Sequence, residues 1–127
     1  FFFKQKTAYE IPKRDWSSDV CSSDLAFGSS GLAVVKYLTG HKRLVLGNHD
    51  KDKITNYLAA GFQKVSAYHY GFKGFMLSHI PLHPMSIKSG WLNVHGHMHQ
   101  RPPYSDQYRN VSVERINYTP VLLESLR

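Results

Sequence analysis

Three short segments of the sequence join glycine or serine to side chains that bind metal ions or transfer protons. They are residues 47–50 (GNHD), 78–81 (SHIP) and 96–99 (GHMH). Imidazole nitrogens together with an amide oxygen suit borderline divalent ions such as Mn, Fe, Zn or Co, whereas oxygen ligands alone would suit Mg or Ca. A glycine directly before the histidines lets the backbone approach an ion closely. Each segment alone is a weak signal, and the three together predict a site for divalent ions.

Each of these segments follows a stretch that we expect to be a β-strand. The apolar run 44–46 precedes GNHD, an alternating stretch at 64–79 predicts a hairpin that ends at SHIP, and residues 91–95 lead into GHMH. We expect His95, at the end of the last of these stretches, to be structural rather than a ligand. Ligand sites of α/β sheets collect at strand ends, where all three segments lie.

The remaining elements complete an α/β pattern. Helical spacing predicts short helices at 30–39 and 52–60, each followed by a glycine, and Asp52 is the expected N-terminal cap of the second. Residues 100–107 are expected to be a loop, and residues 110–118 a last strand or pair of strands. With 127 residues the chain fits one small domain.

Taken in order, the three segments resemble the calcineurin-like metallophosphoesterases, whose motifs are D-x-H, G-D, G-N-H-[DE], a lone His and G-H-x-H. The last three motifs are present in that order, and the resemblance extends across essentially all of the sequence after residue 25. The resemblance implies an α/β fold, namely a four-layer sandwich of two mixed β-sheets flanked by helices, with its N-terminal part missing here. It also implies a hydrolase that cleaves phosphomonoester or phosphodiester bonds through a dinuclear metal centre.

The resemblance divides the candidate ligands between two divalent ions. It makes Asn48, His79 and His97 ligands of one ion and His99 a ligand of the other. Manganese is the expected metal, with Fe, Zn, Co or Ni as alternatives. Two neighbouring ions can activate water near neutral pH and polarise phosphoryl oxygens, so the reaction needs no side-chain nucleophile.

Two further residues receive catalytic roles from the resemblance. His49 would contact the phosphate and stabilise or protonate the leaving oxygen, and Asp50 would orient the imidazole of His49. The D-x-H and G-D motifs are absent, and the bridging aspartate of the family belongs to G-D. We therefore expect the parent protein to be an enzyme and the chain as given to be nearly inactive.

Residues 1–25 differ from the rest of the sequence. They show neither helical nor strand periodicity, and the stretches FFFKQKTAYE and DWSSDVCSSDL resemble the translation of a common sequencing-library adapter, in the expected order. We therefore expect residues 1–25 to be a non-native, adapter-derived segment and residues 26–127 to be the C-terminal portion of a calcineurin-like phosphoesterase domain. Asp24, which the adapter encodes, falls where the bridging aspartate belongs, and we interpret this as coincidence.

The composition is that of a globular chain, with 42% hydrophobic and 20% charged residues. No apolar run approaches the roughly 20 residues that cross a bilayer, and the single cysteine, Cys21, cannot form an internal disulfide. We expect a cytoplasmic protein with no membrane partner. The formal net charge of +7 is scattered, so we expect it to favour the approach of an anionic phosphoester substrate.

Two other classes of function stay open at this stage. The first is a non-catalytic basic domain that binds nucleic acid, with its histidines holding a structural metal. The lack of cysteine ligands after residue 25 and of a compact basic stripe counts against it. The second is a family member that has lost catalysis and serves as a scaffold. Loops and additional domains choose the substrate in such folds, so the motifs specify a phosphoester and no more.

Overall fold

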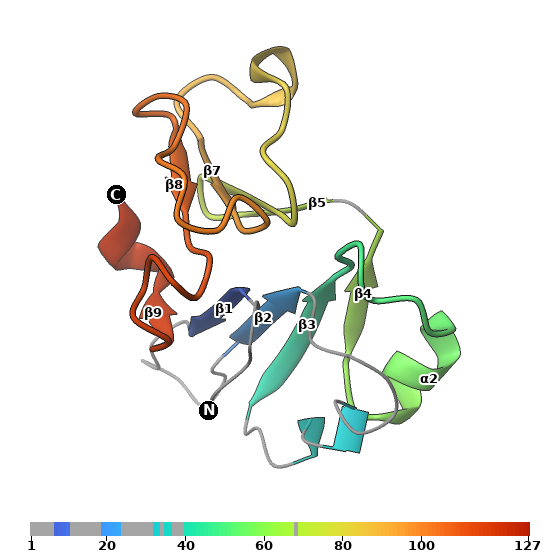
Figure 1. Ribbon diagram of the computed structural model, residues 1–127. Coiled ribbons are helices and arrows are strands. Elements are labelled where there is room, and N and C mark those ends of the chain that lie inside the picture. Colours follow the sequence, from blue (N-terminus) through green and yellow to red (C-terminus); the bar gives the residue numbers. More distant parts are fainter. Residues whose placement is uncertain (1–6, 11–18, 24–31, 34, 37–39, 68) are drawn as a thin grey trace.

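Two mixed β-sheets that face each other dominate the molecule (Figure 1). The computed structural model describes residues 7–10, 19–23, 32–33, 35–36, 40–67 and 69–127. Helices are few in this part of the chain. The expected α/β class is thus confirmed.

The first sheet has five strands among the described residues, in the order β4-β3-β2-β1-β9. They are β1 (Thr7–Glu10), β2 (Asp19–Ser23), β3 (His41–Val45), β4 (Lys64–Ser66) and β9 (Val121–Leu122). Strands β2, β3 and β4 run parallel, whereas β1 is antiparallel to β2 and parallel to β9. The strand predicted around residues 44–46 is confirmed as β3.

The second sheet has four strands in the described part of the chain, in the order β5-β6-β7-β8. They are β5 (His69–Phe72), β6 (Phe75–Ser78), β7 (Leu92–His95) and β8 (Tyr108–Asn110). Strands β6, β7 and β8 run parallel, and β5 pairs antiparallel with β6 at the edge. The carboxyl ends of β6 and β7 therefore lie next to each other.

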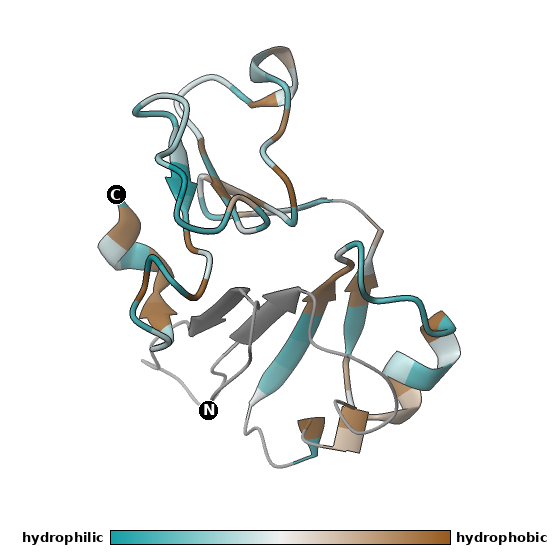
Figure 2. Cartoon of the chain, viewed as in Figure 1, coloured by the Kyte–Doolittle hydropathy of each residue, from teal (hydrophilic) through white to brown (hydrophobic). Residues whose placement is uncertain are grey.

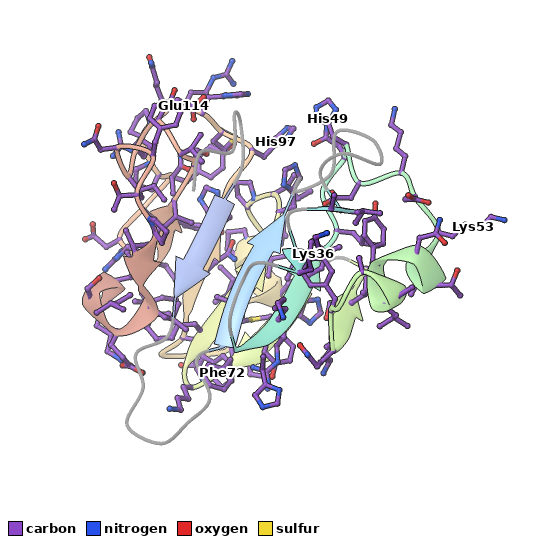
Figure 3. The ribbon with its side chains drawn as sticks, turned by 90° about the horizontal axis from the view of Figure 1, so that it is seen from below. Lys36, His49, Lys53, Phe72, His97 and Glu114 are labelled. Atoms are coloured by element: carbon purple, nitrogen blue, oxygen red, sulfur yellow. The ribbon has the colours of Figure 1, made fainter. Side chains whose placement is uncertain are left out.

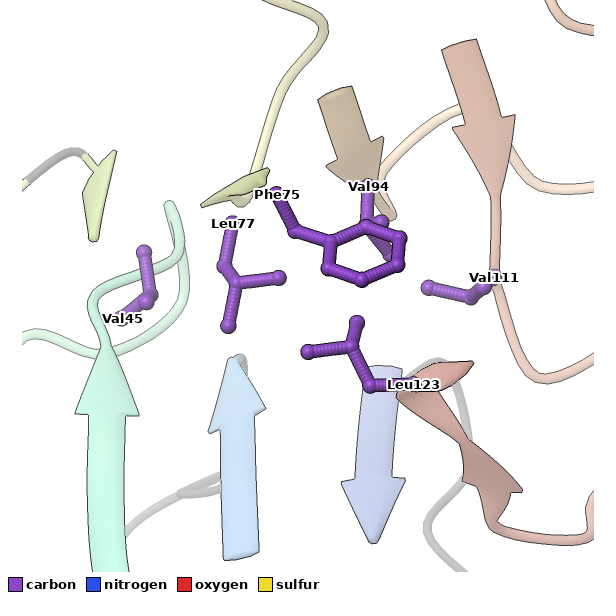
Figure 4. Packing of buried hydrophobic residues seen from close by; sticks show 6 residues of the cluster. All are labelled: Val45, Phe75, Leu77, Val94, Val111 and Leu123. Carbon is purple, nitrogen blue, oxygen red and sulfur yellow. The ribbon is translucent and has the colours of Figure 1, made fainter. Parts of the chain in front are cut away.

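A hydrophobic core fills the space between the two sheets (Figure 4). The second sheet contributes Phe75, Leu77 and Val94, and the side of the first sheet contributes Val45 and Leu123, all at most 2% exposed. Because burial of apolar surface is the main favourable term in folding, this core fixes the distance between the sheets and the place where each strand ends.

Strand β3 shows how the sequence sets that position. It begins with His41, Lys42 and Arg43 and ends with the buried Leu44 and Val45. Figure 2 shows this change from hydrophilic to hydrophobic along the strand. The C-terminal end of β3 is thus held in the interior, so the position at which the GNHD segment begins is fixed.

The outer faces of the sheets carry two smaller apolar clusters. Val35, Leu44, Tyr57 and Phe62 pack where α2 (Ile54–Ala59) covers the first sheet. On the second sheet Met76, Ile87 and Tyr108 pack beneath the loop that contains the 3-10 helix η1 (Pro84–Ser86). A second 3-10 helix, η2 (Leu123–Leu126), ends the chain. No helix among the described residues combines the length and apolar character needed to cross a membrane.

The two predicted helices are borne out to different extents. Leu32, Ala33 and Val35 are helical, and the rest of the predicted stretch lies largely outside the described residues. The second prediction is confirmed as α2, but its N-cap is Lys53 rather than Asp52. The Asp52 side chain still closes the first turn, because its Oδ1 accepts hydrogen bonds from the N–H of Lys53 (2.8 Å) and Nδ2 of Asn56 (2.6 Å).

The predicted hairpin is confirmed for its second half only. Strands β5 and β6 join through Lys73 and Gly74, whose φ angles of 45° and 84° are those of a type I′ turn that matches the twist of the strands. The prediction was wrong for residues 64–66, which form β4 in the other sheet. Helix α2 gives β3 and β4 the crossover that parallel neighbours require.

One sequence pattern and one further expectation differ from the structure. Residues 1–25 carry no strand periodicity, yet β1 and β2 lie there, between β3 and β9. Backbone hydrogen bonds do not depend on side chains, so two extended segments can fill this gap without a period-2 pattern. The strand predicted at residues 110–118 was wrong beyond Asn110, because β8 ends there and residues 111–118 leave the second sheet before β9. Asn110 Oδ1 accepts hydrogen bonds from the N–H and Oγ of Ser112 (3.0 and 2.7 Å), which turns the chain away.

We predict that Phe75→Ala lowers the free energy of unfolding by about 3–5 kcal/mol, because it leaves a cavity between the sheets. Met85→Ala is the matched control, since Met85 is 89% exposed and should change stability by less than about 0.5 kcal/mol. Urea unfolding followed by circular dichroism measures both. Equal effects of the two substitutions would contradict the placement of the core.

Candidate metal centre

The GNHD, SHIP and GHMH segments converge at one end of the molecule. SHIP and GHMH follow the adjacent ends of β6 and β7, and the N–H of Gly96 donates a 3.0 Å hydrogen bond to the carbonyl of His79. GNHD arrives from β3 in the facing sheet. In Figure 3 the labelled His49, His97 and Glu114 lie toward one end of the molecule and Phe72 lies toward the other.

Three side chains meet at this point, one from each segment. Nε2 of His79 lies 2.6 Å from Oδ1 of Asn48 and 3.0 Å from Nδ1 of His97. The two imidazole rings stand edge to face, with centroids 4.9 Å apart. His79 is 6% exposed, whereas Asn48 and His97 are open to solvent. The Asn48–His79–His97 cluster is therefore anchored by one buried imidazole and accessible from outside.

Hydrogen bonding alone serves this cluster poorly. If Nε2 of His79 is protonated, Asn48 and His97 must share a single proton, and if it is not, Nε2 and Oδ1 of Asn48 are two acceptors in contact. A divalent cation relieves either arrangement, because all three atoms can then offer a lone pair. Bonds of roughly 2.0–2.2 Å from an ion to N and O ligands place neighbouring ligand atoms ~3.0–3.5 Å apart. The 3.0 Å separation of the two histidine nitrogens fits that range, whereas the 2.6 Å between Nε2 of His79 and Oδ1 of Asn48 is shorter and would have to widen around an ion.

The donor set therefore fits the metal that the sequence predicts. Among the residues that the structure describes, no three His, Cys, Asp or Glu side chains form a metal-binding group. Here the third donor is the amide oxygen of Asn48. An amide and two imidazoles form a neutral set that suits borderline divalent ions.

Buried polar side chains hold the first two segments in place. Asp50 is 8% exposed, and its Oδ2 accepts a 2.9 Å hydrogen bond from the N–H of Gly47, which closes the GNHD turn. Asn93 is fully buried on β7 and donates to the carbonyl of Met76 and to Oγ of Ser78 (2.8 and 2.9 Å). Its Oδ1 accepts from the N–H of Leu82 (2.8 Å), so Asn93 ties β6 to the chain on both sides of SHIP.

The GHMH segment has a strained backbone. His97 and His99 have φ angles of 62° and 48°, in the left-handed region that costs a side-chain-bearing residue about 1–2 kcal/mol. Hydrogen bonds hold this conformation. The N–H of Met98 donates to the carbonyl of Gly96 (2.7 Å), and Nδ2 of Asn110 donates to the carbonyl of His99 (2.9 Å). Strain of this kind is concentrated at functional sites.

His99 stands apart from the cluster and contacts Glu114. Its Nδ1 lies 2.8 Å from Oε1 of Glu114, and both residues line a pocket of about 580 Å³ together with His97, Met98, Gln100 and Arg101. Burial raises the pKa of the Glu114 carboxyl, but the hydrogen bond from His99, a hydrogen bond from the backbone of Glu114 itself and the charge of His99 together outweigh burial, so the pKa lies below its ordinary value. The carboxylate is therefore ionised at neutral pH, and Nδ1 of His99 is the donor.

His95 lies on β7 and is 1% exposed. Its Nδ1 lies 2.9 Å from the carbonyl of Gly96, and its Nε2 has no hydrogen-bond partner within the described residues. Burial lowers the pKa of His95 below its ordinary value of 6.5; the hydrogen bond to Gly96 opposes the shift, and His97 adds to it. The imidazole is thus kept neutral beneath the GHMH segment.

The structure brings together three of the six residues that the sequence singles out, namely Asn48, His79 and His97. His49 is exposed beside them in the GNHD turn, and Asp50 is buried at its end. Asp24, which falls where the family has its bridging aspartate, lies outside the described residues.

The sequence gives no signal for three residues that hold the site. Glu114 lies in the strand predicted at residues 110–118, where a charged side chain indicates only that this face of the strand is exposed to solvent. Asn93 and Asn110 are each nine-tenths or more buried and satisfy loop backbone groups, a role that only tertiary contacts reveal.

Comparison with known proteins bears on the fold. No protein-family model matches the chain, and no curated protein matches it. The chain is similar to a protein of unknown function from Aquifex aeolicus, whose crystal structure it matches with a TM-score of 0.52 and 26% sequence identity over 77% of this chain and 68% of that one. This likeness supports the α/β fold.

We predict that the free energy of unfolding falls as the pH drops below 6.5 toward the lower pKa of folded His95. In that window the unfolded chain binds a proton at His95 and the folded chain does not, so protonation favours unfolding. Above 6.5 this contribution to stability is fully present. NMR titration of the His95 ring and urea unfolding on either side of 6.5 measure the two quantities, and His95→Gln should remove this part of the pH dependence. Titration of His95 at or above 6.5 would contradict its neutral burial.

Proposed function

We propose that this chain is the C-terminal portion of a metal-dependent phosphoesterase domain. The observation that carries the proposal is the convergence of Asn48 Oδ1, His79 Nε2 and His97 Nδ1 from three separate segments, with distances of 2.6 and 3.0 Å. The two facing sheets would be part of the four-layer sandwich of calcineurin-like metallophosphoesterases, and the D-x-H and G-D motifs would belong to the segment that residues 1–25 replace.

The proposed division of the ligands is the one that the family resemblance implies. Asn48, His79 and His97 would hold one divalent ion, and His99, whose Nδ1 faces Glu114, would serve the other. When bound, such ions supply Lewis acidity toward phosphoryl oxygens and lower the pKa of water. Manganese is the first candidate, and Fe, Zn, Co and Ni also suit the neutral donor set.

The residues of the chain would perform the remaining tasks. His49 is exposed next to Asn48, so its imidazole would contact a phosphate bound at the cluster and donate a proton to the leaving oxygen. Asp50 would fix the turn that carries His49, since its Oδ2 accepts from Gly47 (2.9 Å). The formal charge of +7 would favour approach of an anionic phosphomonoester or phosphodiester.

The first test is metal binding by the chain itself. We predict that it binds one Mn²⁺ or Zn²⁺ ion through the Asn48–His79–His97 cluster, and that His97→Gly weakens binding by at least about 100-fold, beyond the roughly 10- to 100-fold cost of losing a partner of a ligand. Glycine also suits the positive φ at this position, so the variant should fold. Isothermal titration calorimetry measures the affinity.

His41→Ala is the matched control for this titration, because His41 is exposed at the opposite end of β3. It should leave the affinity unchanged. Equal losses in the two variants, or tight binding that survives His97→Gly, would show that the ion binds elsewhere and would sink the proposed site.

The second test is hydrolysis by a chain in which the native residues preceding Ala26, expected to include D-x-H and G-D, replace residues 1–25. We predict Mn²⁺-dependent cleavage of a chromogenic phosphodiester, lost on chelation. His49→Ala should lower kcat by about 10²- to 10⁴-fold, the usual loss of a general acid, with little change in metal affinity. Lys53→Ala, an exposed control near the same turn, should keep full activity. Undiminished activity in His49→Ala would refute the role of His49.

A further inference from the structure

We propose that Glu114 and Asn110 are positioning residues for His99, so that the segment after β8 sets the second half of the metal centre. This inference rests on the proposed function, in which His99 serves the second ion. The two residues act on different parts of His99. Nδ2 of Asn110 holds its carbonyl at 2.9 Å, and Oε1 of Glu114 holds its ring at 2.8 Å.

The hydrogen bond to Glu114 selects one form of the imidazole. A carboxylate only accepts hydrogen bonds, so Nδ1 of His99 must carry the proton. In the neutral ring Nε2, on the opposite edge, then keeps its lone pair. Because His99 lines the pocket of about 580 Å³, this lone pair is available to a cation or ligand held there. A carboxylate behind a metal-binding histidine commonly fixes its tautomer and raises its basicity.

Two features of Glu114 suggest that it is not placed there for stability. Its side chain is 16% exposed, but its Oε2 is buried with no hydrogen-bond partner among the described residues. A carboxylate oxygen without a donor is unfavourable inside a protein. The partner that Glu114 does have, His99, is 56% exposed and could be solvated by water instead.

Asn110 supplies the backbone half of the arrangement. Its Nδ2 donates to the carbonyls of His99 and Arg101 (2.9 and 2.8 Å), so it bridges the strained GHMH turn and the residues that follow it. Its Oδ1 accepts from Ser112 and turns the chain toward Glu114. One buried side chain thus fixes the φ of 48° at His99 and brings Glu114 to its ring.

The test is the protonation state of the His99 ring in the metal-free chain, read by long-range ¹H–¹⁵N NMR near neutral pH. We expect the Nδ1–H form in the wild type and loss of that preference in Glu114→Gln, which keeps the size of the side chain and removes its charge. Zn²⁺ titration followed at the same ring signals should show an affinity lower by about 10- to 100-fold in Glu114→Gln. Glu124→Gln, an exposed carboxylate paired with Arg127, should change neither readout.

The outcomes separate the two proposals. An Nε2–H form in the wild type, or an Nδ1–H form with unchanged Zn²⁺ response in Glu114→Gln, overturns the role of Glu114 even if His79 and His97 bind Zn²⁺ as proposed. Absence of any Zn²⁺ response at His79 and His97 overturns the proposed function, whatever form His99 takes. The positioning role is supported if Glu114→Gln both loses the Nδ1–H form and binds Zn²⁺ more weakly, while Glu124→Gln shows neither effect.

Discussion

The parallel pairing of β6 with β7 is the constraint on which the candidate site depends. Ser78 lies opposite His95 in this register, so the next residues, His79 and Gly96, can join through the 3.0 Å backbone hydrogen bond. A slip of one residue would turn the side chains of a strand to its other face. The register is held by Phe75, Leu77 and Val94, which are buried against the first sheet. Packing between the sheets thus determines where the imidazoles meet.

The buried polar side chains of the second sheet show that the placement of the three segments lowers the stability of the fold. Asn93, His95 and Asn110 are buried on the face away from the central core, and two non-glycine residues of GHMH have positive φ. A sheet that served stability alone would carry apolar residues here and glycine in the turn. These departures lie beneath the three converging segments, where local rules commonly give way to function. The buried polar side chains and the positive φ angles are therefore the physical reason to place the candidate site at this end of the molecule.

Local patterns in the sequence predict the parts of the molecule that depend on neighbouring residues. The apolar end of β3, the hairpin of β5 and β6, and the three polar segments all follow from short stretches. Contacts between distant segments escape such patterns. The Glu114–His99 pair spans 15 residues, and β4 leaves its expected hairpin to pair with β3. Strands β1 and β2 show the converse, because a place between two strands can be filled without any alternating pattern.

We propose that Asn48, His79 and His97 together bind one divalent ion. The most direct measurement is X-ray absorption at the zinc edge on the chain loaded with one equivalent of Zn²⁺. We expect an ion coordinated by two imidazoles at about 2.0–2.1 Å, with oxygen completing its ligand set. Absorption from a zinc ion with no imidazole neighbour, or with a single one, would contradict it.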